Sequence, residues 1–109
     1  MQEKIEKKYK FDPGTDLNLM SKGEFFWILK KSGLTYSQLG ENAREIFGRI
    51  KPLSKQAIYN WYFQGEFMKG SQIWLLYQSL NSDVFFKYRR MYYDDYVKKN
   101  NESPYKNYE

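Results

Sequence analysis

Hydrophobic residues recur at helical spacing in five stretches of the chain, and turn-forming residues separate these stretches. In the first stretch, Ser21 and Glu24 have the spacing of a capping box, in which each side chain bonds the other residue's backbone. Gly33 follows as a stop, because glycine adopts the left-handed conformation that ends many helices. The pattern predicts a helix over 22–32, with Phe25, Phe26 and Leu29 facing inward.

The second and third helices are predicted by the same signals. Thr35 and Gln38 repeat the capping box, and Pro52 ends any continuation, so the second helix is expected over 36–49. Its nonpolar stripe comprises Leu39, Ala43, Ile46, Phe47 and Ile50. Ser54 is expected to cap a third helix over 55–64, whose inward side comprises Ala57, Ile58 and Trp61.

Two further helices and two terminal segments complete the expected organisation. Nonpolar residues predict helices over 72–80 and 83–99, with Ser82 or Asp83 as the cap of the last helix. Residues 1–20 are interpreted as an arm with a turn at Asp12, whose Ile5, Tyr9 and Phe11 dock on the body. Residues 100–109 are expected to form a frayed polar tail. The fold class predicted for the chain is an all-α bundle.

The composition of the 109 residues limits the chemistry that the chain can perform. It contains no cysteine and no histidine, which removes thiolate nucleophiles, imidazole bases and the usual zinc ligands. The few acidic residues form no converging set, so we expect no enzyme, no metal and no cofactor. Residues 1–10 contain no nonpolar run typical of a signal peptide, and no stretch is long enough to cross a membrane. A cytoplasmic location is therefore expected.

The net charge of +5 is concentrated in the middle of the chain. Residues 21–70 contain eight Lys or Arg and four acidic residues. By contrast, residues 1–20 have no net charge, and residues 71–109 contain six Lys or Arg and five acidic residues. A local positive surplus favours a polyanionic partner such as nucleic acid.

The segment 34–65 resembles the helix-turn-helix of the lambda-repressor-like (Cro/Xre) family. The opening pattern of that family corresponds to Leu34-Thr35-Tyr36-Ser37-Gln38-Leu39-Gly40, and its recognition-helix pattern to Leu53-Ser54-Lys55-Gln56-Ala57-Ile58-Tyr59-Asn60-Trp61. The connection is longer than usual, as in POU-specific domains, and Tyr62 replaces a common Glu. The resemblance implies a five-helix bundle that binds double-stranded DNA, with the helix-turn-helix domain in 21–81 and a packing or dimerisation helix in 82–99.

The resemblance also implies roles for individual residues, because a recognition helix fits the major groove while the preceding helix crosses phosphates. Base-reading roles fall to the outward residues Lys55, Gln56, Tyr59 and Asn60. Phosphate contacts are expected from Thr35, Ser37, Gln38, Arg44, Arg49, Lys51 and Ser54. The implied function is that of a small transcriptional regulator, such as a repressor of a phage or mobile element.

The last helix has aromatic residues on more than one face, and a monomer was expected to bury only one of them. This pattern predicts a homodimer or another protein partner, with an interface that includes Phe85, Tyr88, Tyr92 and Tyr96. The neighbouring Arg89 and Arg90 are interpreted as solvated charges. The same features leave open a second hypothesis, in which the chain is a protein-binding inhibitor, for example of a host defence nuclease. A binder of single strands or RNA, suggested by the tyrosine content alone, ranks last.

Overall fold

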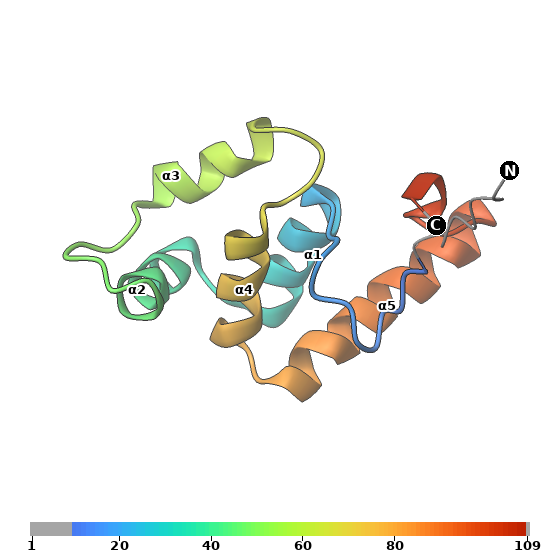
Figure 1. Ribbon diagram of the computed structural model, residues 1–109, viewed down its shortest axis with the longest axis horizontal. Helices are drawn as coiled ribbons and strands as arrows, with labels where there is room; N and C mark the ends of the chain where they lie inside the picture. Colours follow the sequence, from blue (N-terminus) through green and yellow to red (C-terminus); the bar gives the residue numbers. More distant parts are fainter. Residues whose placement is uncertain (1–9, 109) are drawn as a thin grey trace, which may run out of the picture.

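The computed structural model describes residues 10–108, which fold into a bundle of five α-helices without a named strand (Figure 1). The expected all-α class is thereby confirmed, whereas Ile5 and Tyr9 lie outside the described residues. In chain order, the elements are α1 (Lys22–Ser32), α2 (Tyr36–Ile46), α3 (Lys55–Asn60), the 3-10 helix η1 (Trp61–Phe63), α4 (Gly70–Ser79), α5 (Ser82–Asn100) and the 3-10 helix η2 (Lys106–Tyr108).

The predicted N-terminal caps are present at the first three helices, because a short hydroxyl side chain precedes each one. Ser21 and Ser54 each accept a hydrogen bond from the backbone N–H three residues later, at 3.1 Å. The reciprocal half of the capping box expected at Ser21 is absent, because the Glu24 carboxylate bonds Arg89 and the Ser21 N–H donates to Tyr105 instead. Thr35 and Gln38 form the reciprocal capping box, with bonds of 3.1 and 2.9 Å. At α5 the cap is Asn81 rather than the expected Ser82 or Asp83, since its side chain accepts from the Val84 N–H at 2.8 Å.

Two helices are shorter than the sequence predicts. The second helix ends at Ile46 because Gly48 takes up a left-handed conformation, with φ of 64°, and turns the chain away. Phe47 and Ile50 consequently leave the nonpolar stripe and are 41% and 93% exposed. The third helix ends at Asn60 and continues only as the 3-10 turn of η1.

One core joins all five helices. The helix α1 packs against α4 and α5, while α2 packs against α3 and α4. The first helix buries Ile28 with Phe25 and Leu29, whereas the expected core residue Phe26 is only half-buried. The remaining fully buried nonpolar residues of the helices are Leu39, Ala43, Ile58, Ile73, Leu75, Leu76 and Phe85.

The α2–α3 connection is fixed by a close approach at Gly40. A Cβ atom at Gly40 would lie 2.0 Å from the carbonyl oxygen of Leu53, and the Leu53 N–H donates to the Gly40 carbonyl at 3.2 Å. No side chain fits there, because real Cβ contacts of that length do not occur. Glycine therefore sets the distance between α2 and the residues that lead into α3.

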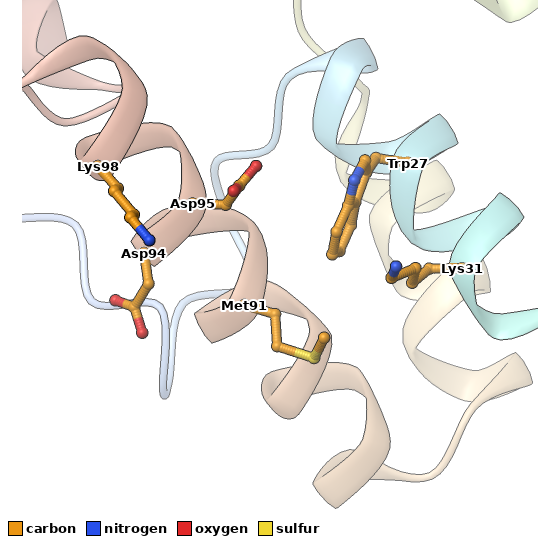
Figure 2. Close-up of a pocket in the computed structure, with 6 residues that line it drawn as sticks. All are labelled: Trp27, Lys31, Met91, Asp94, Asp95 and Lys98. Atoms are coloured by element: carbon orange, nitrogen blue, oxygen red, sulfur yellow. The ribbon is translucent and has the colours of Figure 1, made fainter.

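A cleft of about 490 Å³ separates part of α1 from α5 (Figure 2). Trp27 of α1 and Met91 of α5 point toward one another across it, and Lys31 lies with its Nζ 5.6 Å from the centre of the Trp27 ring. Asp94, Asp95 and Lys98 complete the lining. The charges of both signs around this cleft leave it without a marked preference for an anion or a cation.

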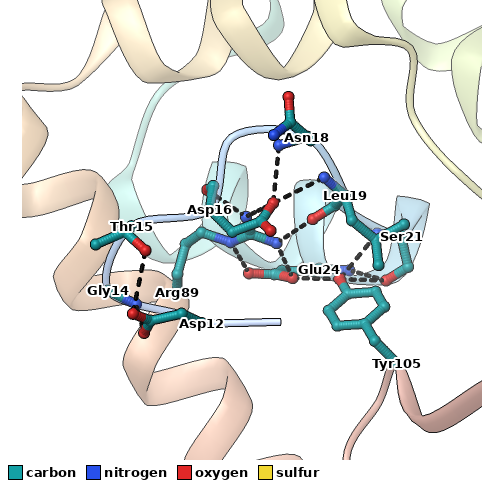
Figure 3. A network of polar contacts seen from close by, with 10 residues as sticks. All are labelled: Asp12, Gly14, Thr15, Asp16, Asn18, Leu19, Ser21, Glu24, Arg89 and Tyr105. Carbon is teal, nitrogen blue, oxygen red and sulfur yellow. Dashed lines mark hydrogen bonds and ion pairs between the residues drawn. The ribbon is translucent and has the colours of Figure 1, made fainter. Parts of the chain in front are cut away.

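Arg89 is a buried charge, which corrects the expectation that it is solvated. Its Nε and Nη2 bond the two oxygens of Glu24 at 2.7 and 2.8 Å, and both side chains are fully buried (Figure 3). The remaining Nη donors bond the carbonyls of Asp16 and Leu19 at 2.8 and 2.6 Å. Burial lowers the pKa of Arg89, but the bond and charge of Glu24 outweigh it, so that the pKa lies above its ordinary value.

The C-terminal tail is ordered against this network, contrary to the expectation of a frayed end. Tyr105 is buried, donates its hydroxyl hydrogen to Glu24 and accepts from the Ser21 N–H at 2.9 Å (Figure 3). Its ring packs on Phe11, which docks as predicted, and on Phe67. Residues 10–20, α1, α5 and the tail therefore form a single packed end of the molecule.

Candidate nucleic-acid interface

The polar side of α3 is open to solvent, as the sequence predicts. Its four exposed residues are Lys55, Gln56, Tyr59 and Asn60. Between them, Ile58 is fully buried and fixes the rotation of the helix on the core. The ordered tail lies at the opposite end of the bundle from α3, so it does not cover this side (Figure 1).

Two amides on this side of α3 are held in a defined arrangement. The Nε2 of Gln56 donates to the Oδ1 of Asn60 at 2.9 Å, one helical turn apart. This bond leaves the Gln56 oxygen as an acceptor and the Asn60 nitrogen as a donor. An adenine in the major groove presents a donor and an acceptor side by side, so the amide pair has the matching chemistry.

Most of the polar side chains expected on phosphates are already used by the protein itself. Thr35, Gln38 and Ser54 are exposed, but each bonds the backbone at the start of its helix. Ser37, also exposed, lies in the first turn of α2. The structure thus places these residues at helix starts, where three of the four stabilise the caps.

The three basic residues expected on phosphates differ in their surroundings. Arg44 forms an ion pair with Glu41 at 3.0 Å, which reduces its free charge. Arg49 and Lys51 are exposed in the connection before α3, and the Arg49 Nε bonds the Lys51 carbonyl at 3.3 Å. Residues 47–65 contain three basic side chains and no acidic one, so this region is the positive side of the α2–α3 unit.

An aromatic hollow of about 260 Å³ lies beside the end of α3, and the sequence reasoning did not identify it. Its lining consists of Phe26, Tyr36, Tyr59, Tyr62 and Phe63. Phe63 is 66% exposed. Its ring packs edge to face on the rings of Tyr59 and Tyr62, with 5.5 Å between ring centres in each pair. The spacing of these three residues, which places them on one side of a helix, was a signal in the sequence.

The aromatic residues of α5 pack mainly within the chain. Phe85 is fully buried, so it is unavailable to a partner and its predicted interface role is wrong. Tyr88 packs against the core, and Tyr92 meets Trp27 edge to face at 5.5 Å. Burial raises the pKa of Tyr92 above its ordinary value. The ring of Tyr96 lies beside it, with 6.2 Å between the two ring centres. One copy of the chain therefore covers part of the aromatic surface of α5, and the homodimer stays a prediction.

Comparisons of the chain with protein-family models, with curated proteins and with solved structures found no match. Across residues 10–108, no three His, Cys, Asp or Glu side chains gather as metal ligands would. In the same part of the chain, no helix combines the length and nonpolar character needed to cross a membrane. Any function must therefore be argued from the surfaces described above.

Proposed function

We propose that the protein binds double-stranded DNA in a sequence-specific manner, with α3 in the major groove, and acts as a small transcriptional regulator. The observation that carries this proposal is the open polar side of α3, where Lys55 and the paired amides of Gln56 and Asn60 face solvent. A helix that presents such residues along one exposed side is suited to read base edges. Resemblance of 34–65 to the lambda-repressor-like helix-turn-helix supports the same role.

The surroundings of α3 support contact with a polyanion. Arg49 and Lys51 lie exposed in the loop that leads into the helix, and no carboxylate side chain occurs between residues 47 and 65. The buried Ile58 and the Ser54 cap hold α3 in place, so that little conformational entropy is lost when it binds. Phosphate contacts position the protein, and the amides supply the discrimination between sequences.

The test is duplex binding at several salt concentrations, after selection of bound duplexes from a random pool. Between about 50 and 200 mM salt the affinity should fall steeply, because each neutralised phosphate releases counterions. Gln56→Ala or Asn60→Ala should lose about 1–3 kcal/mol of discrimination at one base pair. Lys51→Gln should instead weaken all duplexes alike and reduce the salt slope by about one.

A matched control is Lys98→Gln, because Lys98 is an exposed lysine on α5, at the α1–α5 cleft. This change removes the same charge and should leave the discrimination and most of the affinity unaltered. Absence of duplex binding by the unmodified protein at low salt contradicts the proposal.

A second candidate function is a protein-binding module, and the observation that favours it is the aromatic hollow. Exposed Tyr and Phe rings are enriched in protein interfaces, where they supply large contact areas. Phe26 of α1 lines the hollow together with Tyr59 of α3, so the hollow extends beyond the surface needed to read DNA. Phe63→Ala separates the two candidates: duplex affinity should survive the change, whereas a protein partner seated in the hollow would be lost.

A further inference from the structure

Ile50 is the most exposed large nonpolar residue among residues 10–108. It lies in the loop that joins α2 to α3, and 93% of its surface is open to solvent. Phe47, in the same loop, is 41% exposed. Single exposed nonpolar residues are common on protein surfaces, so exposure alone does not indicate a function.

The loop holds Ile50 in a fixed position. At its start, the Phe47 N–H donates to the Ala43 carbonyl at 3.0 Å and the Arg49 N–H to the Arg44 carbonyl at 2.8 Å. At its end, the Leu53 N–H donates to the Gly40 carbonyl at 3.2 Å, where no side chain would fit. A nonpolar side chain on a rigid loop can enter a partner with little loss of conformational entropy.

The charges and the position of the loop indicate the kind of partner. Ile50 lies between two exposed cations, Arg49 and Lys51, and the nearest acid along the chain is Glu45 on α2. The loop projects at the end of the molecule where α3 begins (Figure 1). A surface with a nonpolar tip between two cations matches stacked bases between two phosphates.

Building on the proposed DNA-binding function, we infer that this loop is a second contact with the duplex, in which Ile50 inserts between adjacent base pairs. Arg49 and Lys51 hold the phosphates on either side of the opened step. Nonpolar wedges of this kind unstack a base step and bend the duplex, most readily at flexible pyrimidine–purine steps. Burial of Ile50 between bases removes its surface from water and offsets part of the cost of unstacking.

The experiment uses the full chain and a selected duplex that carries the fluorescent base 2-aminopurine at successive positions beside the contact site. Binding of the unmodified protein should raise the fluorescence at one step, because 2-aminopurine brightens when it is unstacked. Ile50→Ala should abolish the rise even at saturation. It should also weaken binding about ten- to a hundredfold, since burial of an isoleucine side chain contributes a free energy of about 1.5–3 kcal/mol. Ile50→Leu should retain both effects.

The control is Met91→Ala, which removes another exposed nonpolar side chain, on α5, and should change neither measurement. If the unmodified protein binds the duplex but Ile50→Ala binds and brightens 2-aminopurine equally well, the wedge is disproved and the DNA-binding function stands. If the unmodified protein binds no duplex, both fail. Binding to phosphatidylserine vesicles that depends on Ile50, without any duplex unstacking, would overturn the wedge in favour of a membrane contact.

Discussion

The Arg89 network and the open side of α3 use similar polar side chains in opposite ways. Arg89 and Glu24 are fully buried, and four hydrogen bonds from the guanidinium reach a carboxylate and two carbonyls. Gln56 and Asn60 bond only one another and face solvent. One region satisfies its polar groups internally and holds residues 16–19 and Tyr105 to α1 and α5, whereas the other keeps its polar groups available.

The comparison teaches that the two regions have separable roles, one in stability and one in binding. Substitutions in the network should destabilise the fold, because they strand buried polar groups. Substitutions on the polar side of α3 should leave stability almost unchanged, since these side chains already contact water.

The largest effect is expected at Arg89. Arg89→Met leaves Glu24 charged and buried, so the free energy of unfolding should fall by about 3–5 kcal/mol, measured by urea denaturation followed by circular dichroism. The double change Arg89→Met with Glu24→Leu should recover part of this loss, because both charges of the fully buried pair are removed together. Arg90→Met is the control, since Arg90 lies next in α5 and is exposed. Equal effects at Arg89 and Arg90 would contradict the network's structural role.

A smaller loss is expected at Gly40. Gly40→Ala forces a Cβ against the Leu53 carbonyl, and overpacking of this kind costs about 1–3 kcal/mol. The change should also displace α3 and weaken duplex binding by the remaining folded protein. Gly70→Ala provides the control in the same urea titration, because nothing lies within 4 Å of a Cβ at that position of α4. A stable Gly40→Ala protein would show that the close approach is unimportant.

Alkaline pH should loosen the tail through Tyr105. Burial, followed by the charge of Glu24, raises the pKa of Tyr105 above its ordinary value of 10.0. The folded protein therefore retains a proton that the unfolded chain releases, so this contribution is complete below about pH 10 and declines above it. Stability measured in urea should fall as the pH rises above about 10, and less steeply in Tyr105→Phe. Identical slopes in the two proteins would exclude Tyr105 as the cause.

The smallest effect on stability is expected on α3 itself. Gln56→Ala and Asn60→Ala should change the free energy of unfolding by less than about 0.5 kcal/mol, because both side chains are exposed. The thermal midpoint and the urea midpoint are the measurements. A loss as large as that of Gly40→Ala would mean that the amide pair supports the fold, and the separation of roles would fail.

The sequence predicted the helices better than it predicted their surroundings, because helix signals are local. Ser21, Thr35 and Gly33 act within a few residues of their own positions, and the first helix has the expected bounds. The end of α2 was missed because its stripe continued through Phe47 and Ile50, while the turn at Gly48 ended the helix earlier. The outward side of α3 followed from the expected inward side of Ala57, Ile58 and Trp61, of which Ile58 is fully buried and the other two are half-buried.

The Arg89 network could not be predicted, because it joins residues far apart in the chain. The Arg89–Glu24 pair spans 65 positions and the Tyr105–Glu24 bond spans 81. No periodic pattern marks such a pairing, so Arg89 was indistinguishable from its solvated neighbour Arg90. The packing of Phe11 on Tyr93 of α5 was hidden for the same reason. Phe85 was assigned to a partner interface because its place in the core, where its ring meets that of Tyr77 of α4, also depends on a neighbouring helix.

The most direct test of the central claim is an NMR titration of the labelled protein with a selected duplex at low salt. The account predicts that backbone amide shifts change most in residues 47–60, which comprise the loop and α3. Amides around Arg89 and in the α1–α5 cleft should remain almost unaltered. Changes concentrated near Trp27 and Met91, or no changes at all on addition of the duplex, would contradict the role assigned to α3.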